Sequence, residues 1–340
     1  MKKTVLVIGG GIAGMTAAAR LADLGISTVI LEKEGEAGGH LRQWDRLFPT
    51  RRPGRDVLDY LSQDLNGKAD IRLGAMIEEI RKETGEFILT LQSGETLRGD
   101  AILFATGFEL FDARKKEEYG YGIYDNVITS AELEAVFQSG RPLMTDQGFP
   151  PKRVGFVHCV GSRDEKVGNL YCSKVCCVTG VKQAIEIREM YPDAEVFGFY
   201  MDLRMFDRFF EELYFEAQQK WDIKFLRGRM SECAENQDHT ILLKLEDTLT
   251  SRPLKMTVDL LVLLVGFVSS AETLRLATML GVGIGEDRFL VPEDMHIRAH
   301  TTKVPGVFLA GAVKGPSCIP NVIADAAAAA MRIHQYLVHS

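Results

Sequence analysis

Residues 3–14 read KTVLVIGGGIAG, and this stretch decides the fold. Its first half, from Lys3 to Ile8, is a short apolar run rich in β-branched residues, which predicts a buried strand. Its second half is Gly9-x-Gly11-x-x-Gly14, and residues 17–24 then predict a helix. A second apolar run, residues 28–31, predicts the next strand. Strand, glycine turn, helix and strand in this order predict a Rossmann-type unit that binds a dinucleotide.

The acid that closes this unit is Glu32, which lies 18 residues after Gly14. A carboxylate at that place accepts hydrogen bonds from ribose hydroxyls, while the glycines let the backbone approach a pyrophosphate. The helix N-terminus adds free N–H groups and the positive end of a dipole. A glycine-rich turn that binds nothing is the alternative. The candidate binding residues of this first motif are Gly9, Gly11, Ile12, Ala13, Gly14, Glu32 and Lys33.

A second glycine pair, Gly38-Gly39, follows shortly after Glu32. Glycines just beyond the ribose acid make the chain resemble the FAD-binding two-domain flavoproteins. In that family a strand like residues 101–107 closes the site, and a later strand like residues 306–311 leads into a Gly-Asp pair. Here Ala312 stands where that Asp binds the ribityl chain. The resemblance implies FAD contacts at Gly39, His40, Leu41, Ala105, Thr106, Gly107, Gly311, Ala312, Lys314, Ile319 and Pro320.

The alanine-rich segment from Ile319 to Arg332 predicts a helix near the C-terminus. In the same family its N-terminus points at the flavin pyrimidine ring, where the helix dipole stabilises negative charge on a reduced flavin. Lys314 is a candidate cation beside the flavin, and His40 is a candidate neighbour of the flavin ring. A purely structural role is the alternative for each.

Part of the sequence pattern of the first unit is repeated further along the chain. Residues 87–97 predict a hairpin followed by Asp100, six residues, Gly107 and Phe108; residues 240–257 predict a hairpin followed by Asp259 and the same spacing. This repetition predicts two Rossmann-like dinucleotide-binding domains, as in a thioredoxin reductase-like two-domain flavoprotein of the α/β class, with the second domain inserted in the first. The expected bounds are 1–115 with 275–340 for the FAD-binding domain and 116–274 for the second.

The second domain opens with a predicted strand from Val154, but no GxGxxG follows it. Four of the six cysteines come instead, Cys159, Cys172, Cys176 and Cys177, with 12, 3 and 0 residues between successive members. Four thiolates near a strand end and a helix start favour a [4Fe–4S] cluster in place of NAD(P)H. The spacing leaves open a zinc site, a redox dithiol of Cys172 and Cys176, or buried structural thiols.

Four strings narrow the choice: CVGSRD (159–164), YCSKVCC (171–177), EYGYGIYDNVITSAELE (118–134) and AGAVKGP (310–316). Together they resemble the A-type component of heterodisulfide reductases, over about residues 1–335, in the short form of sulfur-oxidising heterodisulfide reductase-like complexes. The resemblance implies FAD, a [4Fe–4S] cluster on the four cysteines, B- and C-type partner subunits, a lipoate-binding protein, a homodimer and a cytoplasmic location. It predicts a relay that converts paired electrons into single electrons, with the cofactors rather than side chains doing the chemistry.

Composition sets outer limits on these interpretations. The 340-residue chain has a net charge of −7 and no basic stripe, which argues against nucleic acid as a partner. The longest strongly apolar run, residues 258–268, is too short to span a membrane. The alternatives to the relay are an NAD(P)H-dependent flavin disulfide reductase, the flavoprotein of a quinone-interacting oxidoreductase, and a flavin-bearing scaffold. Residues 206–215 predict an aromatic-rich helix that covers the cluster or meets a neighbouring protein chain, with packing in the core as the alternative.

Overall fold

The computed structural model describes residues 3–339, which divide into two compact units. Unit 1 comprises residues up to Arg42, Arg55–Glu109 and Val268 onward, and unit 2 comprises Gln43–Gly54 and Leu110–Phe267. The second unit is therefore inserted in the first, as the sequence predicts. The expected bounds, 1–115 with 275–340 and 116–274, differ from these chiefly because residues 43–54 pack with unit 2.

Unit 1 is built on a five-stranded parallel sheet in the order β20-β9-β1-β2-β5. The central strand is β1, whose last four residues are buried because helices and a second sheet cover both of its faces. Leu6, Phe104 and Leu309 lie in the core beside it. The strands of the sheet are β1 (Thr4–Ile8), β2 (Ser27–Leu31), β5 (Asp70–Arg72), β9 (Ala101–Phe104) and β20 (Val307–Leu309).

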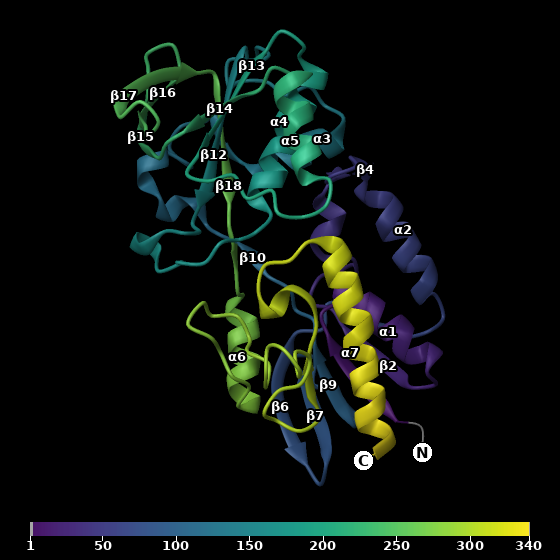
Figure 1. Ribbon diagram of the computed structural model, residues 1–340. Helices are drawn as coiled ribbons and strands as arrows, with labels where there is room; N and C mark the ends of the chain where they lie inside the picture. The colour runs from purple at the N-terminus through teal and green to yellow at the C-terminus, as the bar shows by residue number, and fades with distance from the viewer. Residues whose placement is uncertain (1–2, 340) are drawn as a thin grey trace. The chain divides into compact units, whose positions relative to one another are not determined.

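Helices α1 (Ile12–Asp23) and α7 (Ile319–His339) pack side by side in unit 1 (Figure 1). Helix α6 (Ala271–Leu280) packs on β6 of an antiparallel sheet in the order β6-β7-β8. Helix α2 (Gly54–Leu65) precedes β5. The strands of the antiparallel sheet are β6 (Ile77–Glu83), β7 (Glu86–Leu91) and β8 (Thr96–Gly99), so the first predicted hairpin is present.

Unit 2 repeats this plan with a five-stranded parallel sheet in the order β11-β18-β12-β13-β14. Helices α3, α4 and α5 lie together beside it, and an antiparallel sheet β15-β16-β17 lies apart from them (Figure 1). The helices are α3 (Ser130–Ser139), α4 (Cys176–Met190) and α5 (Phe210–Gln219). The strands are β11 (Val127–Thr129), β12 (Arg153–Val160), β13 (Glu195–Tyr200), β14 (Lys224–Arg227), β15 (Met230–Glu235), β16 (Ile241–Asp247), β17 (Arg252–Val258) and β18 (Leu260–Val265).

The repeated sequence pattern has a structural counterpart at β1 of unit 1 and at β12 of unit 2. Asp100 accepts a hydrogen bond from the Thr4 amide at 2.8 Å and donates its own amide to the Thr4 carbonyl at 2.8 Å. Asp259 does the same for Arg153, with distances of 2.8 and 2.9 Å. Asp100, directly before β9, is thus joined to β1, and Asp259, directly before β18, is joined to β12, which explains why the same residue recurs at the same place.

Residues 43–54 include the short strands β3 (Arg46–Leu47) and β4 (Arg52–Pro53) and are held by buried charges of unit 2. Lys182 on α4 donates to the Arg46 carbonyl at 2.9 Å and forms an ion pair with Glu134 on α3. Glu134 also accepts from the Asp45 amide at 3.0 Å. Both charged side chains are 2% exposed. A buried polar network of this kind is invisible to hydrophobic periodicity, which is why the domain bounds differ.

The aromatic-rich segment differs from its prediction as a helix over residues 206–215. Residues 201–209 are irregular, and α5 begins only at Phe210. Phe209 has a φ of +68°, a left-handed conformation that stops a helix from starting earlier. Phe206 and Phe209 are exposed, so part of the aromatic content lies on the surface.

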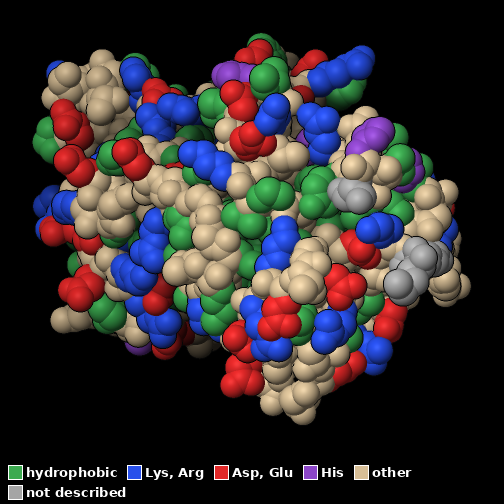
Figure 2. Space-filling model, turned by 90° about the horizontal axis from the view of Figure 1, so that it is seen from below, with side chains coloured by type: hydrophobic (Ala, Val, Ile, Leu, Met, Phe, Trp, Pro, Cys, Tyr) green, Lys and Arg blue, Asp and Glu red, His purple; other side chains and the backbone are tan. Residues whose placement is uncertain are grey.

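The surface mixes both signs of charge. On the face drawn in Figure 2, basic side chains stand among acidic ones rather than in a continuous stripe. Within residues 3–339, no helix is long and apolar enough to cross a membrane.

Candidate functional site

The glycine turn between β1 and α1 has the tight geometry that its spacing predicts. Gly9 has a φ of +106°, and a Cβ placed there would lie 2.5 Å from the Ala105 carbonyl oxygen. A Cβ on Gly14 would lie 1.9 Å from the Gly9 carbonyl oxygen. Helix α1 begins at Ile12, so its N-terminal N–H groups open directly onto the turn. The turn therefore needs glycine at both positions.

Glu32, directly after β2, is buried against this turn. Its two carboxylate oxygens accept hydrogen bonds from the Gly10 amide at 2.7 Å and the Glu34 amide at 2.9 Å. The side chain is only 6% exposed. Each carboxylate oxygen has a second lone pair, so the residue can hold the turn and still accept from a ribose hydroxyl.

The second glycine pair packs onto the first turn. The Gly38 amide donates to the Gly10 carbonyl at 2.8 Å, and a Cβ on Gly39 would lie 3.1 Å from the Gly11 Cα. His40 Nε2 lies 2.9 Å from the Phe108 carbonyl oxygen, and the two rings stack at 4.5 Å with an interplanar angle of 15°. The structure thus brings the predicted residues 9–14 and 38–41 together in unit 1, and the backbone at Phe108 fixes His40.

A carboxylate that sequence reasoning missed lies at the C-terminal part of this site. The Gly311 amide donates to Asp325 Oδ2 at 2.7 Å, and Lys314 Nζ lies 2.7 Å from Asp325 Oδ1. Lys314 also donates to the Ala299 carbonyl at 3.0 Å. Ala312 is buried beside them. The turn has Ala312 in place of an Asp, but Asp325 of α7 supplies a carboxylate to it. In the sequence, the feature that could have indicated this role is that Asp325 is a single acid in an alanine-rich helix.

The remaining predicted residues of unit 1 also lie near this turn. A Cβ on Gly311 would meet the Ala13 side chain at 2.7 Å, so the C-terminal motif touches α1. Thr106, after β9, accepts a hydrogen bond from the Thr273 hydroxyl at 2.7 Å. Helix α7 begins at Ile319, as predicted, with Pro320 in its first turn, where a missing N–H leaves no bond unmade.

The four motif cysteines lie in unit 2, at the end of β12 and the start of α4. Cys159 is the second-last residue of β12, and Cys176 and Cys177 are the first two residues of α4. These three are buried, while Cys172 is half-buried, and none forms a disulfide. Unit 1 has its glycine turn between the corresponding strand and helix.

The loop between Cys159 and Cys172 folds back on itself. The Arg163 amide donates to the Tyr171 carbonyl at 2.8 Å, and the Asn169 side chain donates to the Gly161 carbonyl at 2.9 Å. Asp164 and Asn169 form an antiparallel bridge. These hydrogen bonds hold together the two arms of the loop, which begin at Cys159 and end at Cys172.

The thiols influence one another electrostatically. Burial raises the pKa of Cys177 to about 11 and raises that of Cys176 well above its ordinary value, and charge on the other motif cysteines adds to both rises. Within residues 3–339, however, no group of three or more His, Cys, Asp or Glu side chains could hold a metal ion as it stands. The four cysteines therefore do not form a ligand set for a single metal ion in this arrangement.

Two hydrogen-bond donors beside the motif fit a group that supplies acceptors. Ser162 Oγ and Arg163 Nη1 are buried, and neither has a hydrogen-bond partner among the described residues. Buried donors are nearly always paired in proteins, so two orphans next to four thiols suit the sulfur atoms of an iron–sulfur cluster. The chemistry of the donor set therefore fits such a group.

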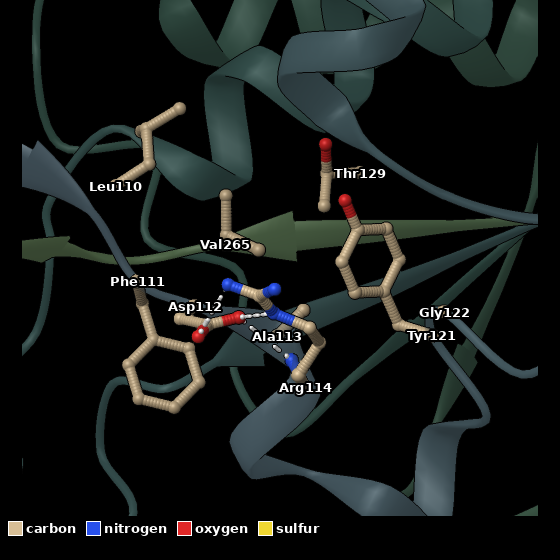
Figure 3. A pocket seen from close by; sticks show the side chains of 9 residues that line it. All are labelled: Leu110, Phe111, Asp112, Ala113, Arg114, Tyr121, Gly122, Thr129 and Val265. Carbon is tan, nitrogen blue, oxygen red and sulfur yellow. Dashed lines mark hydrogen bonds and ion pairs between the residues drawn. The ribbon is translucent and has the colours of Figure 1, made fainter.

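A cavity of about 520 Å³ lies in unit 2 at the carboxyl ends of β11 and β18 (Figure 3). Asp112 and Arg114 form a two-point ion pair in its wall, with N–O distances of 2.8 and 3.0 Å. Ligands of doubly wound sheets bind at this edge. The cavity is lined by Leu110, Phe111, Asp112, Ala113, Arg114, Tyr121, Gly122, Thr129 and Val265.

Two family models match the chain in the two regions that carry these sites. Residues 7–80 match the NAD(P)-binding Rossmann-like domain, and residues 176–332 match the pyridine nucleotide-disulphide oxidoreductases. The glycine turn lies in the first matched region, and two of the motif cysteines open the second.

The chain is also similar in sequence to components of heterodisulfide reductases. It is 33% identical to the A-type component of the H(2):CoB-CoM heterodisulfide,ferredoxin reductase of Methanothermobacter marburgensis, over 96% of this chain and 63% of that protein. It is 30% identical to the A-type iron-sulfur component of the CoB--CoM heterodisulfide reductase of Methanocaldococcus jannaschii, over 97% of this chain and 64% of that protein. The chain thus spans a little under two thirds of the length of these relatives.

Solved structures confirm the predicted thioredoxin reductase-like fold across the chain. The thioredoxin reductase of T. acidophilum superposes with a TM-score of 0.69 at 19% identity, covering 99% of this protein and all of that chain. The bacillithiol disulfide reductase of Staphylococcus aureus superposes with a TM-score of 0.65 at 13% identity, covering 100% and 99% of the two chains. At such identities the likeness concerns the fold alone.

Proposed function

We propose that this chain is the FAD- and [4Fe–4S]-carrying electron-transfer component of a heterodisulfide reductase-like complex. The observation that carries the proposal is the cysteine motif between β12 and α4. In unit 1 the equivalent position is the glycine turn between β1 and α1. The two Rossmann-like units thus have glycines in one and cysteines in the other at the same position. We take this difference as support for two different redox groups in one chain.

In this proposal unit 1 holds FAD through backbone groups. The glycine turn and the N-terminus of α1 receive the pyrophosphate, and Glu32 accepts from the ribose. Asp325 positions the Gly311 turn through its amide and neutralises Lys314. When bound, the flavin exchanges electrons in pairs and an iron–sulfur cluster exchanges them singly.

In unit 2 the ligands are Cys159, Cys172, Cys176 and Cys177. These four thiolates would hold the cluster, because metal sites commonly form only as the metal binds. The amides at the start of α4 and the buried donors of Ser162 and Arg163 would supply hydrogen bonds to its sulfur atoms.

The names of the similar proteins suggest the complex in which this chain works. These proteins are named as A-type components of CoB-CoM heterodisulfide reductases. By this analogy the partners are B- and C-type subunits, together with a lipoate-binding protein and a second copy of this chain, in the cytoplasm. The relay then carries electrons between a sulfur- or disulfide-processing partner and a further acceptor, in sulfur oxidation.

The test is anaerobic purification with iron, sulfide and flavin assays and EPR after dithionite reduction. We expect about four irons per chain, flavin bands and a reduced-cluster EPR signal. Cys176→Ser removes one ligand and should reduce both iron content and the signal. Cys233→Ser, on β15 outside the motif, is the matched control and should leave both unchanged. Flavin without iron, even after anaerobic reconstitution, would contradict the proposal.

A second candidate, an NAD(P)H-dependent flavin disulfide reductase, is favoured by the cavity at the carboxyl edge of the unit 2 sheet. A nicotinamide bound there would lie against Leu110, Phe111 and Val265. Rapid flavin reduction by NADH or NADPH, weakened at least about tenfold in Arg114→Ala, would support this candidate. The absence of any flavin reduction by either nucleotide would exclude it.

A further inference from the structure

The backbone of the cysteine loop is strained at three non-glycine residues. Cys159, Arg163 and Lys174 have φ values of +62°, +53° and +59°, in the left-handed region that non-glycine residues rarely adopt. Three such residues in one short segment mark a conformation that is imposed by its surroundings. Of the three, Arg163 carries a charge next to the motif and has a defined partner.

Arg163 is fixed by Asp202, which follows β13. Arg163 Nη2 donates to Asp202 Oδ2 at 2.7 Å. The main-chain carbonyl of the same aspartate lies 3.7 Å from Cys177 Sγ, which donates to it. Asp202 therefore touches the motif with its backbone while it holds the guanidinium with its side chain. The Arg163 side chain is 20% exposed, so much of its charge is felt inside the protein.

The guanidinium interacts with the motif itself. Burial would lower the pKa of Arg163, but Asp202 and Cys159 raise it above its ordinary value. Burial raises the pKa of Cys159, and the Arg163 cation opposes that rise. One guanidinium nitrogen, Nη1, is buried with no hydrogen-bond partner among the described residues. A donor is thus left over on the cation beside the thiols.

We propose that Arg163, held by Asp202, is the residue that sets the redox potential of the group bound by the four cysteines. The proposal rests on the proposed function. Reduction adds one electron and therefore one negative charge to the cluster, with no bond made or broken in the protein. A fixed cation and a donor to sulfur stabilise the reduced form, so Arg163 raises the potential. Asp202, which partly neutralises that cation, lowers it.

The opposite signs of the two residues make the test sharp. The wild type, Arg163→Gln, Arg163→Lys and Asp202→Asn are titrated potentiometrically at one pH, with the reduced cluster followed by EPR. At a fixed applied potential we expect Arg163→Gln to lower the reduced-to-oxidised ratio about tenfold, which is about 59 mV for one electron. Arg163→Lys should lie between Arg163→Gln and the wild type. Asp202→Asn should shift the ratio the other way.

Arg153→Gln is the matched control, because it removes the same charge at the opposite end of β12. Arg153 is the first residue of β12 and pairs at the surface with Glu195, whereas Cys159 lies near the end of the strand. The strand separates the two residues by about 20 Å, which is more than a Debye length in physiological salt. The reduced-to-oxidised ratio of Arg153→Gln at the same applied potential should equal that of the wild type.

Iron analysis of each variant separates the possible failures. A wild type without iron overturns the proposed function, and this inference with it. Iron in the wild type with the same potential in Arg163→Gln and Asp202→Asn overturns this inference alone. If Arg163→Gln assembles no cluster, the sign of the Asp202→Asn shift decides: a rise supports the proposal, and a fall or no change contradicts it.

Discussion

At the scale of single residues, Glu186 on α4 shows how burial changes an acid. It is 5% exposed, and neither carboxyl oxygen has a hydrogen-bond partner among the described residues, although Lys182 Nζ lies 3.2 Å from Oε2. Burial raises its pKa to about 7, and Glu134 adds to the rise, while Lys182 and Arg46 oppose it. Arg51 is a further charge of this neighbourhood.

This raised pKa predicts a pH-dependent stability. The folded protein binds the Glu186 proton more tightly than the unfolded chain, so its contribution is complete below pH 4.5 and is lost as the pH rises to about 7. The loss is about 3 kcal/mol at about 1.36 kcal/mol per unit of pKa. Glu186→Gln should therefore unfold at a higher denaturant concentration than the wild type at about pH 8 and at a similar one near pH 4.

Chemical denaturation of both proteins between about pH 4 and 8 measures this difference. Glu212→Gln, an exposed acid on α5, serves as the control and should follow the wild type. If the free energy of unfolding depends on pH in the same way in Glu186→Gln and in the wild type, the Glu186 carboxyl group ionises in the folded protein without a loss of stability.

At the scale of the element, the cysteine loop depends on a buried ion network. Lys116 Nζ lies 2.7 Å from Asp164 Oδ2 and 2.7 Å from Glu118 Oε1, and Lys116 and Asp164 are both 2% exposed. Arg229 adds a contact to Asp164 at 3.1 Å. Asp164 also caps the short helix at residues 165–167 within the loop. The loop conformation therefore depends on these charges rather than on apolar packing.

Removal of one partner should expose this dependence. Lys116→Met leaves the buried Asp164 carboxylate without its main counter-charge, and an uncompensated buried charge destabilises a protein by about 3–5 kcal/mol. We expect a loss of this size in the free energy of unfolding, measured in urea at about pH 7. Lys116→Arg, which keeps the charge, should recover part of it. A loss below about 1 kcal/mol in Lys116→Met would show that Arg229 compensates Asp164 alone.

Elements that depend on periodicity and glycine spacing were predictable, whereas elements that depend on buried charge were not. The strand at Lys3–Ile8, the turn at Gly9–Gly14 and the helix that starts at Cys176 follow from the sequence, because hydrophobic pattern and glycine sterics are local. Asp325 at the Gly311 turn and Lys182 beneath residues 43–54 were not found. Each is a single charge whose partner lies on another element, and no local pattern reports that pairing.

At the scale of the whole molecule, the candidate FAD residues all lie in unit 1 and the motif cysteines all lie in unit 2. The two cofactors should therefore be separable by mutation in the full chain. Gly14→Val adds a side chain whose Cβ would lie 1.9 Å from the Gly9 carbonyl oxygen, so it should abolish flavin binding and leave iron in place. Cys176→Ser should do the reverse.

Flavin and iron contents of the two purified variants provide the measurement. Circular dichroism of each variant shows whether the fold is kept. Simultaneous loss of both cofactors in each well-folded variant would show that occupancy of one site requires occupancy of the other.

The hydrogen bonds of Asp100 and Asp259 bear on how far the length of the intervening segments can vary. Asp100 joins β9 to β1 and Asp259 joins β18 to β12, across sequence separations of 96 and 106 residues. The entropy of closing so long a segment grows only with the logarithm of its length. Segments spliced in or cut out between the joined strands therefore alter the folding free energy little, provided that these hydrogen bonds are kept. Each unit can thus gain or lose whole modules in evolution while its parallel sheet stays the same.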